Sequence, residues 1–533
     1  MYLIIATLWL FWEVKYVLFW LYLWQLKDYH VGRFADHFRT HKGKKILLDV
    51  SRVIKLVLFV LFLALGSFFV YLLYILLLVY LAEFLMLLRS VINRSIKKPK
   101  KTFKILFLGA VSFAVVVLFL AEMLKFNSPA LLLGFDILTP IVVSVIVLLF
   151  QPIFVLMRNH TLRKARDKME KIKSLGGLKV IAITGSYGKT STKEFLSAIL
   201  SKKYKVLKTK EHQNSEIGIA KCILQELKPS HQIFIAEVGA YDKGKVKEVC
   251  SILKPKIGIV TGVNEQHLAL FGSLKNLLSA EGGGELADSL SKDGLLVVNG
   301  DNKYCLDLYR KFNGNKRIYS LSNKIMNSDI WTEEMIVAKK FVSFIAVNRN
   351  KEMSHFTANV LGGHCVQNLL GAILIARELG MSFGEISVAC GNIFEEQAGM
   401  TLKSGKYGIN IVDSSYSANP DGVFADLDYL SVFQGKRLIV MPCLIELGKK
   451  SGEIHQKIGR KIGEICDLAV ITSKDKFEEI KKGAIGAGME DRDILLCDKP
   501  QDICSIITLS CKAGDVVLLE GRVPGELINL LTL

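Results

Sequence analysis

Apolar residues dominate the first 157 positions of the chain, in runs long enough to cross a membrane. A helix needs about 20 apolar residues to span the roughly 30 Å hydrocarbon core of a bilayer. Three runs meet this length: residues 2–24, 104–124 and 130–156. A fourth run, residues 53–91, is about twice as long as one crossing requires. We therefore expect it to fold back as a tight hairpin near Gly66 and Ser67.

Basic residues flank these runs and predict their orientation. About fifteen of the nineteen excess positive charges precede residue 176, in segments 27–45, 89–101 and 158–166. Basic flanking segments stay on the cytoplasmic side, and placing all three there requires that residues 53–91 cross twice. This gives five crossings, or four if that run crosses once. We expect a multi-pass inner-membrane protein with cytoplasmic catalytic domains, in contact with membrane lipid and not with nucleic acid.

Charged residues also occur within or at the edges of the predicted spans. They are Glu13, Lys15, Glu83, Glu122 and Asp136. Intramembrane charges are candidates for function. The simpler interpretation is that these side chains extend to a membrane interface.

Beyond residue 178 the pattern changes to short β-rich runs that alternate with helical stretches. Such alternation is typical of a parallel sheet flanked by helices. The predicted fold class is an α-helical transmembrane region followed by α/β domains. The expected parts are a transmembrane region (1–157), a basic linker helix (158–177), a central P-loop domain with a parallel sheet (178–398) and a smaller Rossmann-like C-terminal domain (399–533). All ten cysteines follow residue 221 without metal-ligand spacing, which indicates buried thiols and no structural zinc.

A phosphate-binding loop follows the β-rich run 179–184. Its residues are Gly185, Ser186, Tyr187, Gly188, Lys189, Thr190 and Ser191. The glycines let backbone N–H groups approach phosphate oxygens, and the following helix adds its positive N-terminal end. Lys189 is placed to reach the β- and γ-phosphates and the Thr190 hydroxyl to reach Mg²⁺. The common P-loop carries a further glycine where this chain has Ile183.

The variant T-G-S-x-G-K-T-S-x-K resembles the Mur ligases, which build the peptide of the bacterial cell wall. Further segments resemble family motifs in the family's order: 214–218, 235–240, 266–268 with 271–273, 299–302, 363–368, 413–420, and 446–448 with His455. The resemblance covers about residues 178–533. Within the family it is closest to the enzymes that add D-alanyl-D-alanine to a UDP-linked muramoyl tripeptide.

The resemblance implies an ADP-forming, ATP-dependent ligase that uses Mg²⁺ as two ions. Glu237 and His267 would be metal ligands together with Thr190, Asn368 would meet the adenine, and Asp413 would belong to the nucleotide-binding set. The substrates would be a cell-wall peptide precursor and an amino acid or dipeptide. Transfer of the γ-phosphoryl group to a carboxylate would give an acyl phosphate that an amine attacks. The resemblance implies no oligomeric state.

Several positions depart from the family pattern. Glu281 stands eight residues after Ser273, where the family has a carbamoylated lysine, so its carboxylate is expected to act as the catalytic and metal-binding group. Four further departures concern the substrates: Met400 in place of arginine, Ser414 and Ser417 in place of Asp and Asn, and Glu520 in place of lysine. The family's N-terminal UDP-binding domain is replaced by the membrane region.

Three hypotheses therefore stand. The first is a ligase that adds D-alanyl-D-alanine to the muramoyl tripeptide. The second is a membrane-anchored Mur-type ligase with another acceptor, which amidates a lipid-linked precursor or forms a polyglutamate-type chain. The third is a nucleotide-binding membrane scaffold without ligase chemistry. The intact Lys189, Thr190, Glu237 and His267 disfavour the scaffold, whereas Met400 and Glu520 leave it open.

Overall fold

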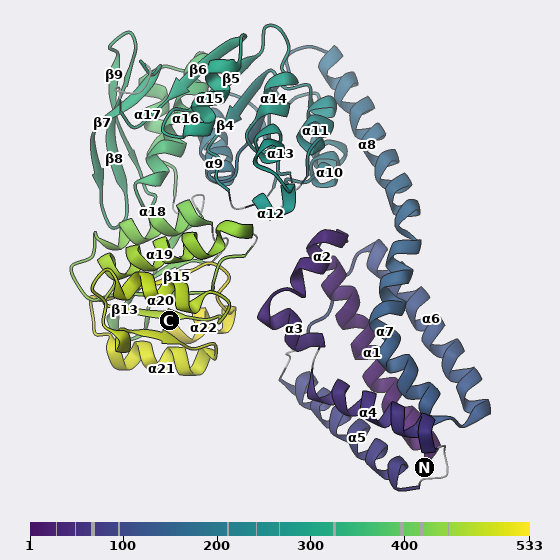
Figure 1. The fold of residues 1–533 in the computed structure, drawn as a ribbon. Helices are drawn as coiled ribbons and strands as arrows, with labels where there is room; N and C mark the ends of the chain where they lie inside the picture. The colour runs from purple at the N-terminus through teal and green to yellow at the C-terminus, as the bar shows by residue number, and fades with distance from the viewer. Residues whose placement is uncertain are drawn as a thin grey trace. The chain divides into compact units, whose positions relative to one another are not determined.

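The structure is a computed structural model and describes residues 1–533 except 28, 48, 66–69, 94–95, 211–212, 241, 266, 323–326, 395–398, 416–418, 446 and 533. It divides into two compact units, residues 1–159 and 160–533 (Figure 1). The first unit is helical and the second is α/β. The boundary falls inside one long helix, α8 (Gln151–Ser174).

The first unit consists of helices packed around a core rich in tryptophan. They are α1 (Tyr2–Leu26), α2 (Val31–His37), α3 (His41–Leu47), α4 (Val50–Leu65), α5 (Val70–Ile92), α6 (Phe103–Phe126), α7 (Pro129–Leu149) and the start of α8. Helix α1 contacts α5, α6 and α7, and its Trp9, Trp20 and Trp24 are almost completely buried. The opposite faces of these helices expose large apolar side chains, such as Leu78 and Leu118. An apolar exterior of this kind is typical of helices surrounded by lipid.

Four helical segments of the described residues are long and apolar enough to cross a membrane: Tyr2–Leu26, Val70–Ile92, Phe103–Phe126 and Pro129–Ser174. Residues 53–91 do not form one helix, because α4 ends at Leu65 and α5 begins at Val70. The expected turn at Gly66 and Ser67 lies outside the described residues. Helix α4 has 16 residues, or about 24 Å, which is shorter than the bilayer core.

The second unit begins with a nine-stranded sheet and its helices. The strands are β1 (Lys179–Thr184), β2 (Val206–Lys208), β3 (Ile233–Glu237), β4 (Ile257–Val260), β5 (Leu295–Asn299), β6 (Asn315–Tyr319), β7 (Ile330–Val337), β8 (Val342–Asn348) and β9 (Met353–Ala358). The helices are α9 (Lys189–Leu200), α10 (Glu216–Glu226), α11 (Lys245–Leu253), α12 (Leu268–Phe271), α13 (Leu274–Ser279), α14 (Gly284–Asp288), α15 (Lys303–Lys311), α16 (His364–Glu378) and α17 (Phe383–Cys390).

The strand order is β2-β3-β1-β4-β5-β6-β7-β8-β9, and the pairs from β2 to β7 are parallel. The parallel sheet predicted for this domain is therefore present. The antiparallel extension β7–β9 is an addition that the sequence pattern did not predict. The chain leaves β1 toward β2 and β3 on one side of it, and β4 lies on its other side. The carboxyl end of β1 is therefore a topological switch point, where α/β folds bind ligands.

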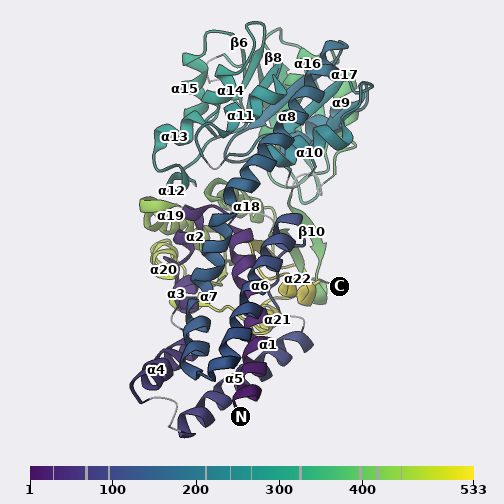
Figure 2. The ribbon, with the colours of Figure 1, turned by 90° about the vertical axis from the view of Figure 1, so that its right-hand side faces the viewer.

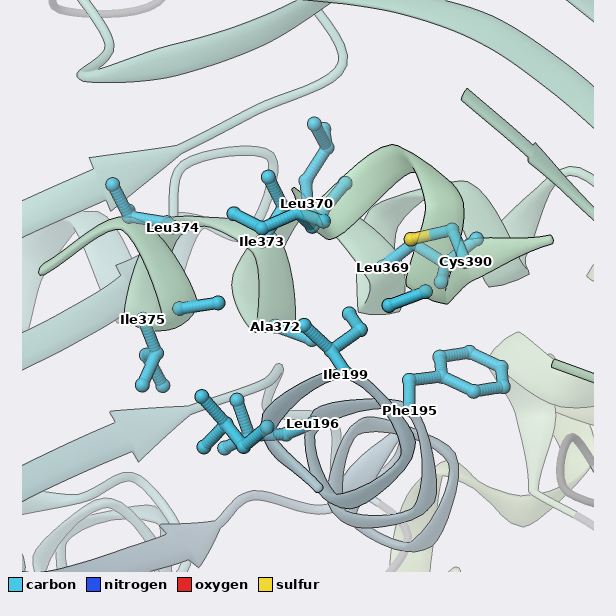
Figure 3. Close-up of a cluster of buried hydrophobic side chains, with 14 of the residues drawn as sticks. Phe195, Leu196, Ile199, Leu369, Leu370, Ala372, Ile373, Leu374, Ile375 and Cys390 are labelled. Atoms are coloured by element: carbon cyan, nitrogen blue, oxygen red, sulfur yellow. The ribbon is translucent and has the colours of Figure 1, made fainter. Parts of the chain in front are cut away.

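Alternate residues of β1 face two different helical layers. Ile181 and Ile183 pack with α9, α16 and α17, whereas Val180 and Ala182 pack with the layer that includes α10, α11 and α14. Figure 2 shows α9, α16 and α17 gathered together. In Figure 3, Phe195, Leu196 and Ile199 of α9 meet the apolar side chains of α16. This packing fixes the helix that begins at the predicted phosphate-binding loop.

The second half of α8 belongs to this unit. Its apolar residues Leu162, Ala165, Met169 and Ile172 recur at helical spacing and are buried in the layer beside β1. The residues between them are mostly charged, and the Glu170 carboxylate lies 2.7 Å from the Lys254 ammonium. The segment predicted as a basic linker is thus an amphipathic helix with one face packed on the α/β unit.

The C-terminal part is a six-stranded sheet with order β10-β11-β15-β12-β13-β14, parallel except for the β10–β11 pair. Its strands are β10 (Thr401–Ser404), β11 (Asn410–Ser414), β12 (Arg437–Met441), β13 (Leu468–Ile471), β14 (Ile494–Leu496) and β15 (Val516–Glu520). Its helices are α18 (Pro420–Leu430), α19 (Ser451–Ile465), α20 (Phe477–Ile485), α21 (Pro500–Ser510) and α22 (Gly525–Leu531), with short 3-10 turns η2 (Lys406–Gly408), η3 (Gly448–Lys450) and η4 (Asp491–Asp493). The predicted α/β class therefore holds for both parts of the unit.

Candidate nucleotide site

The predicted phosphate-binding loop connects the carboxyl end of β1 to the N-terminus of α9. Gly185 and Gly188 both have positive φ, +140° and +76°. Gly188 caps α9, so the first N–H groups of the helix open toward the loop. This arrangement gives an anion the positive end of a helix and a run of backbone donors. The loop therefore has the conformation that phosphate binding requires.

Gly188 is enclosed as well as conformationally restricted. A Cβ atom built there would lie 2.5 Å from the Asn368 side-chain oxygen. Gly244 has a similar φ of +89°, but a Cβ atom there would meet nothing within 4 Å. Alanine substitutions at these two glycines therefore separate the cost of positive φ from the cost of steric crowding.

Replacing Gly188 with alanine is therefore expected to weaken nucleotide binding strongly, because the buried Asn368 side chain or the loop must shift to admit the methyl group. Gly244→Ala meets only the conformational cost, on the order of 1–2 kcal/mol, and should retain the affinity. Titration of both variants with a fluorescent ATP analogue measures this difference. Equal affinities in the two variants would contradict the expected role of the enclosed loop.

The Lys189 ammonium is held inside the loop. It donates hydrogen bonds to the carbonyl oxygens of Gly185 and Ser186, the latter at 3.3 Å. Thr261, at the end of β4, donates from its hydroxyl to the carbonyl of Tyr187 and fixes the other side of the loop. Thr261 was not predicted as a site residue, since nothing in its local sequence marks it.

Glu237 lies at the end of β3 and is almost completely buried. Its carboxylate accepts hydrogen bonds from the Thr190 hydroxyl at 3.1 Å, the Asn214 amide at 3.1 Å and the Lys193 ammonium at 3.2 Å. The structure thus brings together Thr190, Asn214 and Glu237, which lie in three separate motifs of the sequence. Lys193 is fully buried and also pairs with Glu194 at 3.3 Å. It is the final lysine of the T-S-x-K segment, but the sequence alone assigned it no role.

Glu281 lies in the turn between α13 and α14, directly beside the loop. One carboxylate oxygen accepts a hydrogen bond from the Ser186 hydroxyl at 2.9 Å, and the other lies 2.9 Å from Nδ1 of His267. Burial by itself would raise the pKa of the Glu281 carboxyl. The hydrogen bond and charge of His267, with smaller contributions from Lys189 and Ser186, lower this pKa below its usual value. The carboxylate is therefore held in its charged form.

The remaining predicted residues lie at different distances from this centre. Asn368 of α16 lies against Gly188, and its side-chain oxygen is 3.4 Å from the Thr192 hydroxyl. Asp413, at the end of β11, bonds to the Ser415 hydroxyl at 2.6 Å and the Lys403 ammonium at 2.6 Å. The described contacts of Asp413 lie within the C-terminal domain and include none with the loop.

Three residues that depart from the family pattern, Met400, Ser414 and Glu520, are interior residues. Met400 is buried in the apolar core of the C-terminal domain. Glu520 is fully buried at the end of β15, in register with Ser414 of β11. Burial, reinforced by the nearby Asp426, raises the pKa of the Glu520 carboxyl well above its usual value. Ser417 and Glu446 lie outside the described residues, and His455 accepts a hydrogen bond from the N–H of Leu444 at 2.9 Å.

The described residues do not gather three or more His, Cys, Asp or Glu side chains in one metal-binding cluster. They form instead two small centres beside the loop, Thr190 with Glu237 and His267 with Glu281. The oxygen donors of these centres, the Thr190 hydroxyl and the Glu237 and Glu281 carboxylates, fit Mg²⁺, which takes one or two protein carboxylates and completes its shell with phosphate oxygens and water.

The fold and the loop define a class of protein: an α/β P-loop nucleotide-binding domain followed by a Rossmann-like domain. Two family matches are more specific. Residues 183–376 match the Mur ligase middle domain, and residues 400–523 match the Mur ligase glutamate ligase domain. The chain belongs to the Mur ligase family, whose members are ATP-dependent ligases, and it carries the family's middle and C-terminal domains.

Individual relatives match this chain over half of its length or more. The UDP-N-acetylmuramoyl-tripeptide–D-alanyl-D-alanine ligase of Synechocystis is 28% identical over 354 residues, which cover 64% of this chain and 71% of the relative. The enzyme of that name from Escherichia coli is 28% identical over 289 residues, covering 53% and 61%. Among solved structures, MurF from Acinetobacter baumannii matches with a TM-score of 0.62 and 22% identity over 70% of this chain and 80% of that one. MurF from Thermotoga maritima in complex with ADP matches with a TM-score of 0.60 and 23% identity, over 70% of this chain and 83% of that one.

Proposed function

We propose that this chain forms an amide bond on a cell-wall peptide precursor, most like the addition of D-alanyl-D-alanine to UDP-MurNAc-tripeptide. The observation that carries the proposal is the arrangement around the loop, where Lys189, the Thr190–Glu237 pair and the His267–Glu281 pair surround one phosphate-binding backbone. The names of the relatives support the choice of substrates.

The chemistry follows from the charges that must meet. A carboxylate is a poor acceptor for an amine until one of its oxygens becomes a leaving group. Attack of the carboxylate on the γ-phosphorus of ATP forms an acyl phosphate and releases ADP. The amine of the second substrate then displaces phosphate and loses a proton to give the amide. Catalysis of such a step rests on positioning and on charge stabilisation.

Each residue of the site has a part in this scheme. The loop N–H groups and the N-terminus of α9 bind the phosphates, and the Lys189 ammonium stabilises the charge on the transferred group. Thr190 and Glu237 would hold one Mg²⁺, and His267 and Glu281 a second. These ions would screen the phosphate oxygens from the incoming carboxylate. Lys193 and Asn214 position the Glu237 carboxylate from behind.

A second candidate is a membrane-anchored Mur-type ligase with another acceptor, which amidates a lipid-linked precursor or forms a polyglutamate-type chain. Met400 and Glu520 favour it, because the arginine and lysine of the family pattern have become a core methionine and a buried acid. These changes in the C-terminal domain, beside the retained Lys189, Thr190, Glu237 and His267, are consistent with an altered amine or carboxylate substrate.

We further propose the domain boundaries 1–157, 158–177, 178–398 and 399–533, and a multi-pass membrane location with the ligase domains in the cytoplasm. The long apolar helices and the three basic segments support this location. A membrane anchor would keep the ligase close to lipid-linked precursors.

The test is phosphate release by the purified full chain in detergent. We expect release to require UDP-MurNAc-tripeptide and D-alanyl-D-alanine together, with one peptide product formed for each phosphate. Release with other amines or with a lipid-linked precursor alone would favour the second candidate. Nucleotide binding without turnover under every substrate combination would contradict both and leave a binding scaffold.

A further inference from the structure

Four ionisable side chains are buried together inside the helical unit. Glu13 of α1, Lys55 of α4, Glu83 of α5 and Asp136 of α7 are each at most 4% exposed. The Lys55 ammonium lies 2.8 Å from a Glu83 carboxylate oxygen and 2.5 Å from an Asp136 oxygen. These groups therefore do not extend to a membrane interface. By contrast, Glu122 is exposed and pairs with Lys125.

Glu13 is far from both ends of its helix. It lies close to the middle of the 25 residues of α1. In a helix that crosses a bilayer, this position is near the midplane, roughly 17 Å from either end at 1.5 Å per residue. A charge at that depth is expensive unless it is paired or neutralised.

The hydrogen bonds around Glu13 are satisfied more fully by its protonated form than by the carboxylate. The Thr139 hydroxyl lies within hydrogen-bond distance of both the Glu13 carboxyl and the carbonyl oxygen of Phe135, the latter at 2.9 Å. A hydroxyl has one hydrogen to donate, and the carbonyl can only accept. Both contacts are satisfied when Thr139 donates to Phe135 and a protonated Glu13 donates to Thr139.

The second oxygen of Glu13 supports the same assignment. Glu13 Oε2 is buried and has no hydrogen-bond partner among the described residues. An ionised carboxylate with one oxygen unsolvated in apolar surroundings carries a large desolvation penalty, which the neutral acid avoids.

The charges around Glu13 also favour its neutral form. Three carboxyl groups share the single ammonium of Lys55, which contacts Glu83 and Asp136. The two other cations nearby are directed to aromatic rings: Lys15 lies 4.6 Å from the Trp12 ring centre, and Arg52 lies 5.1 Å from that of Tyr16. Helix α5 adds the neutral Tyr80, whose hydroxyl donates to Asp136 at 3.0 Å. Lys15 is also close enough to Glu83 for a charge interaction. Glu13 is thus the one carboxyl of the cluster that forms no ion pair among the described residues.

Exchangeable groups connect this site to one end of α4. Ser51, the second residue of α4, donates its hydroxyl to Glu83 at 2.5 Å, and Glu83 pairs with Lys55. Lys55 pairs in turn with Asp136, and Thr139 lies three residues further along α7, on the same helical face. This series of side chains thus extends from the N-terminal end of α4 to Glu13 in the middle of α1.

We propose that Glu13 is an intramembrane proton-binding site, which takes its proton through the Ser51–Glu83–Lys55–Asp136 series. The proposal rests on membrane insertion of this unit, and not on its ligase activity. In the net step, the Glu13 carboxylate gains one proton from a hydronium ion at the α4 end, which leaves a neutral acid and a water molecule. The Lys55 ion pairs remain charged and hold α4, α5 and α7 together.

Infrared spectroscopy of the full chain in lipid nanodiscs tests this proposal. We expect a carbonyl band of a protonated carboxyl at neutral pH that disappears with a one-proton titration as the pH is raised. Because burial also raises the pKa of the Glu520 carboxyl, the spectra are recorded in a Glu520→Gln background, where Glu13→Gln should remove the band. Glu122→Gln, which alters an exposed glutamate, should leave it unchanged. Thr139→Val should move the band to higher frequency by removing a hydrogen bond, and Thr139→Ser should restore it.

Three results would overturn the proposal. The band could persist in Glu13→Gln, which would place the proton elsewhere. It could be absent from the wild-type chain, which would make the cluster purely ionic. It could vanish when Na⁺ replaces K⁺ at constant pH, which would identify a sodium site. Extraction with alkaline carbonate tests membrane insertion separately, so a chain that inserts but lacks the band refutes the proton site alone.

Discussion

Lys189→Ala is expected to reduce ATP-dependent phosphate release by at least about a hundredfold, while the protein still folds and inserts. The ammonium lies inside the loop on the carbonyls of Gly185 and Ser186, where it faces the phosphates that the loop binds. Removing a positive charge from the transferred phosphoryl group costs on the order of 3 kcal/mol of transition-state stabilisation. Its loss leaves the apolar packing of α9 on α16 unchanged.

Lys202→Ala is the matched control, because this lysine is exposed just beyond the other end of α9. It should retain wild-type turnover. Thermal unfolding of both variants separates a catalytic loss from a loss of structure. Full phosphate release by Lys189→Ala with an unchanged melting temperature would exclude the loop as the nucleotide site.

Glu281→Gln is expected to slow turnover about a hundredfold and to raise the Mg²⁺ concentration required. The amide keeps the size of the side chain but removes the charge beside His267 and the loop. Losing one direct charge contact with a catalytic metal ion costs on the order of 3 kcal/mol. Steady-state phosphate release as a function of Mg²⁺ measures both effects. Glu478→Gln, at an exposed glutamate of α20, is the control.

Bicarbonate dependence is the sharper measurement at this position. Since Glu281 supplies a carboxylate directly, the wild-type enzyme should not respond to added bicarbonate. Glu281→Lys restores the lysine of the family pattern, and any activity it regains should depend on bicarbonate, because the carbamate forms from CO₂. Full turnover of Glu281→Gln at limiting Mg²⁺ would show that this glutamate has no part in the metal site.

The local signals in the sequence were sufficient for the elements of the ligase part. The β-rich run at 179–184 predicted a strand, and the structure has β1 there. A buried parallel strand appears in the sequence as a continuous apolar run. A position with positive φ at the start of a helix appears as a glycine. The antiparallel extension β7–β9 was missed because its strands carry charged and polar residues on an exposed face, as in Ile330–Val337.

What the sequence by itself determined is therefore the loop, the strands, the apolar helices and the membership of the Mur ligase family. The tertiary structure decided which of these distant parts meet. Strand order places β3 and β4 on either side of β1, so that Glu237 and Thr261 reach the loop. Helix packing likewise brings Lys55 to Glu83 and Asp136. Such contacts join residues far apart in the chain, and they depend on packing free energies that no local pattern encodes.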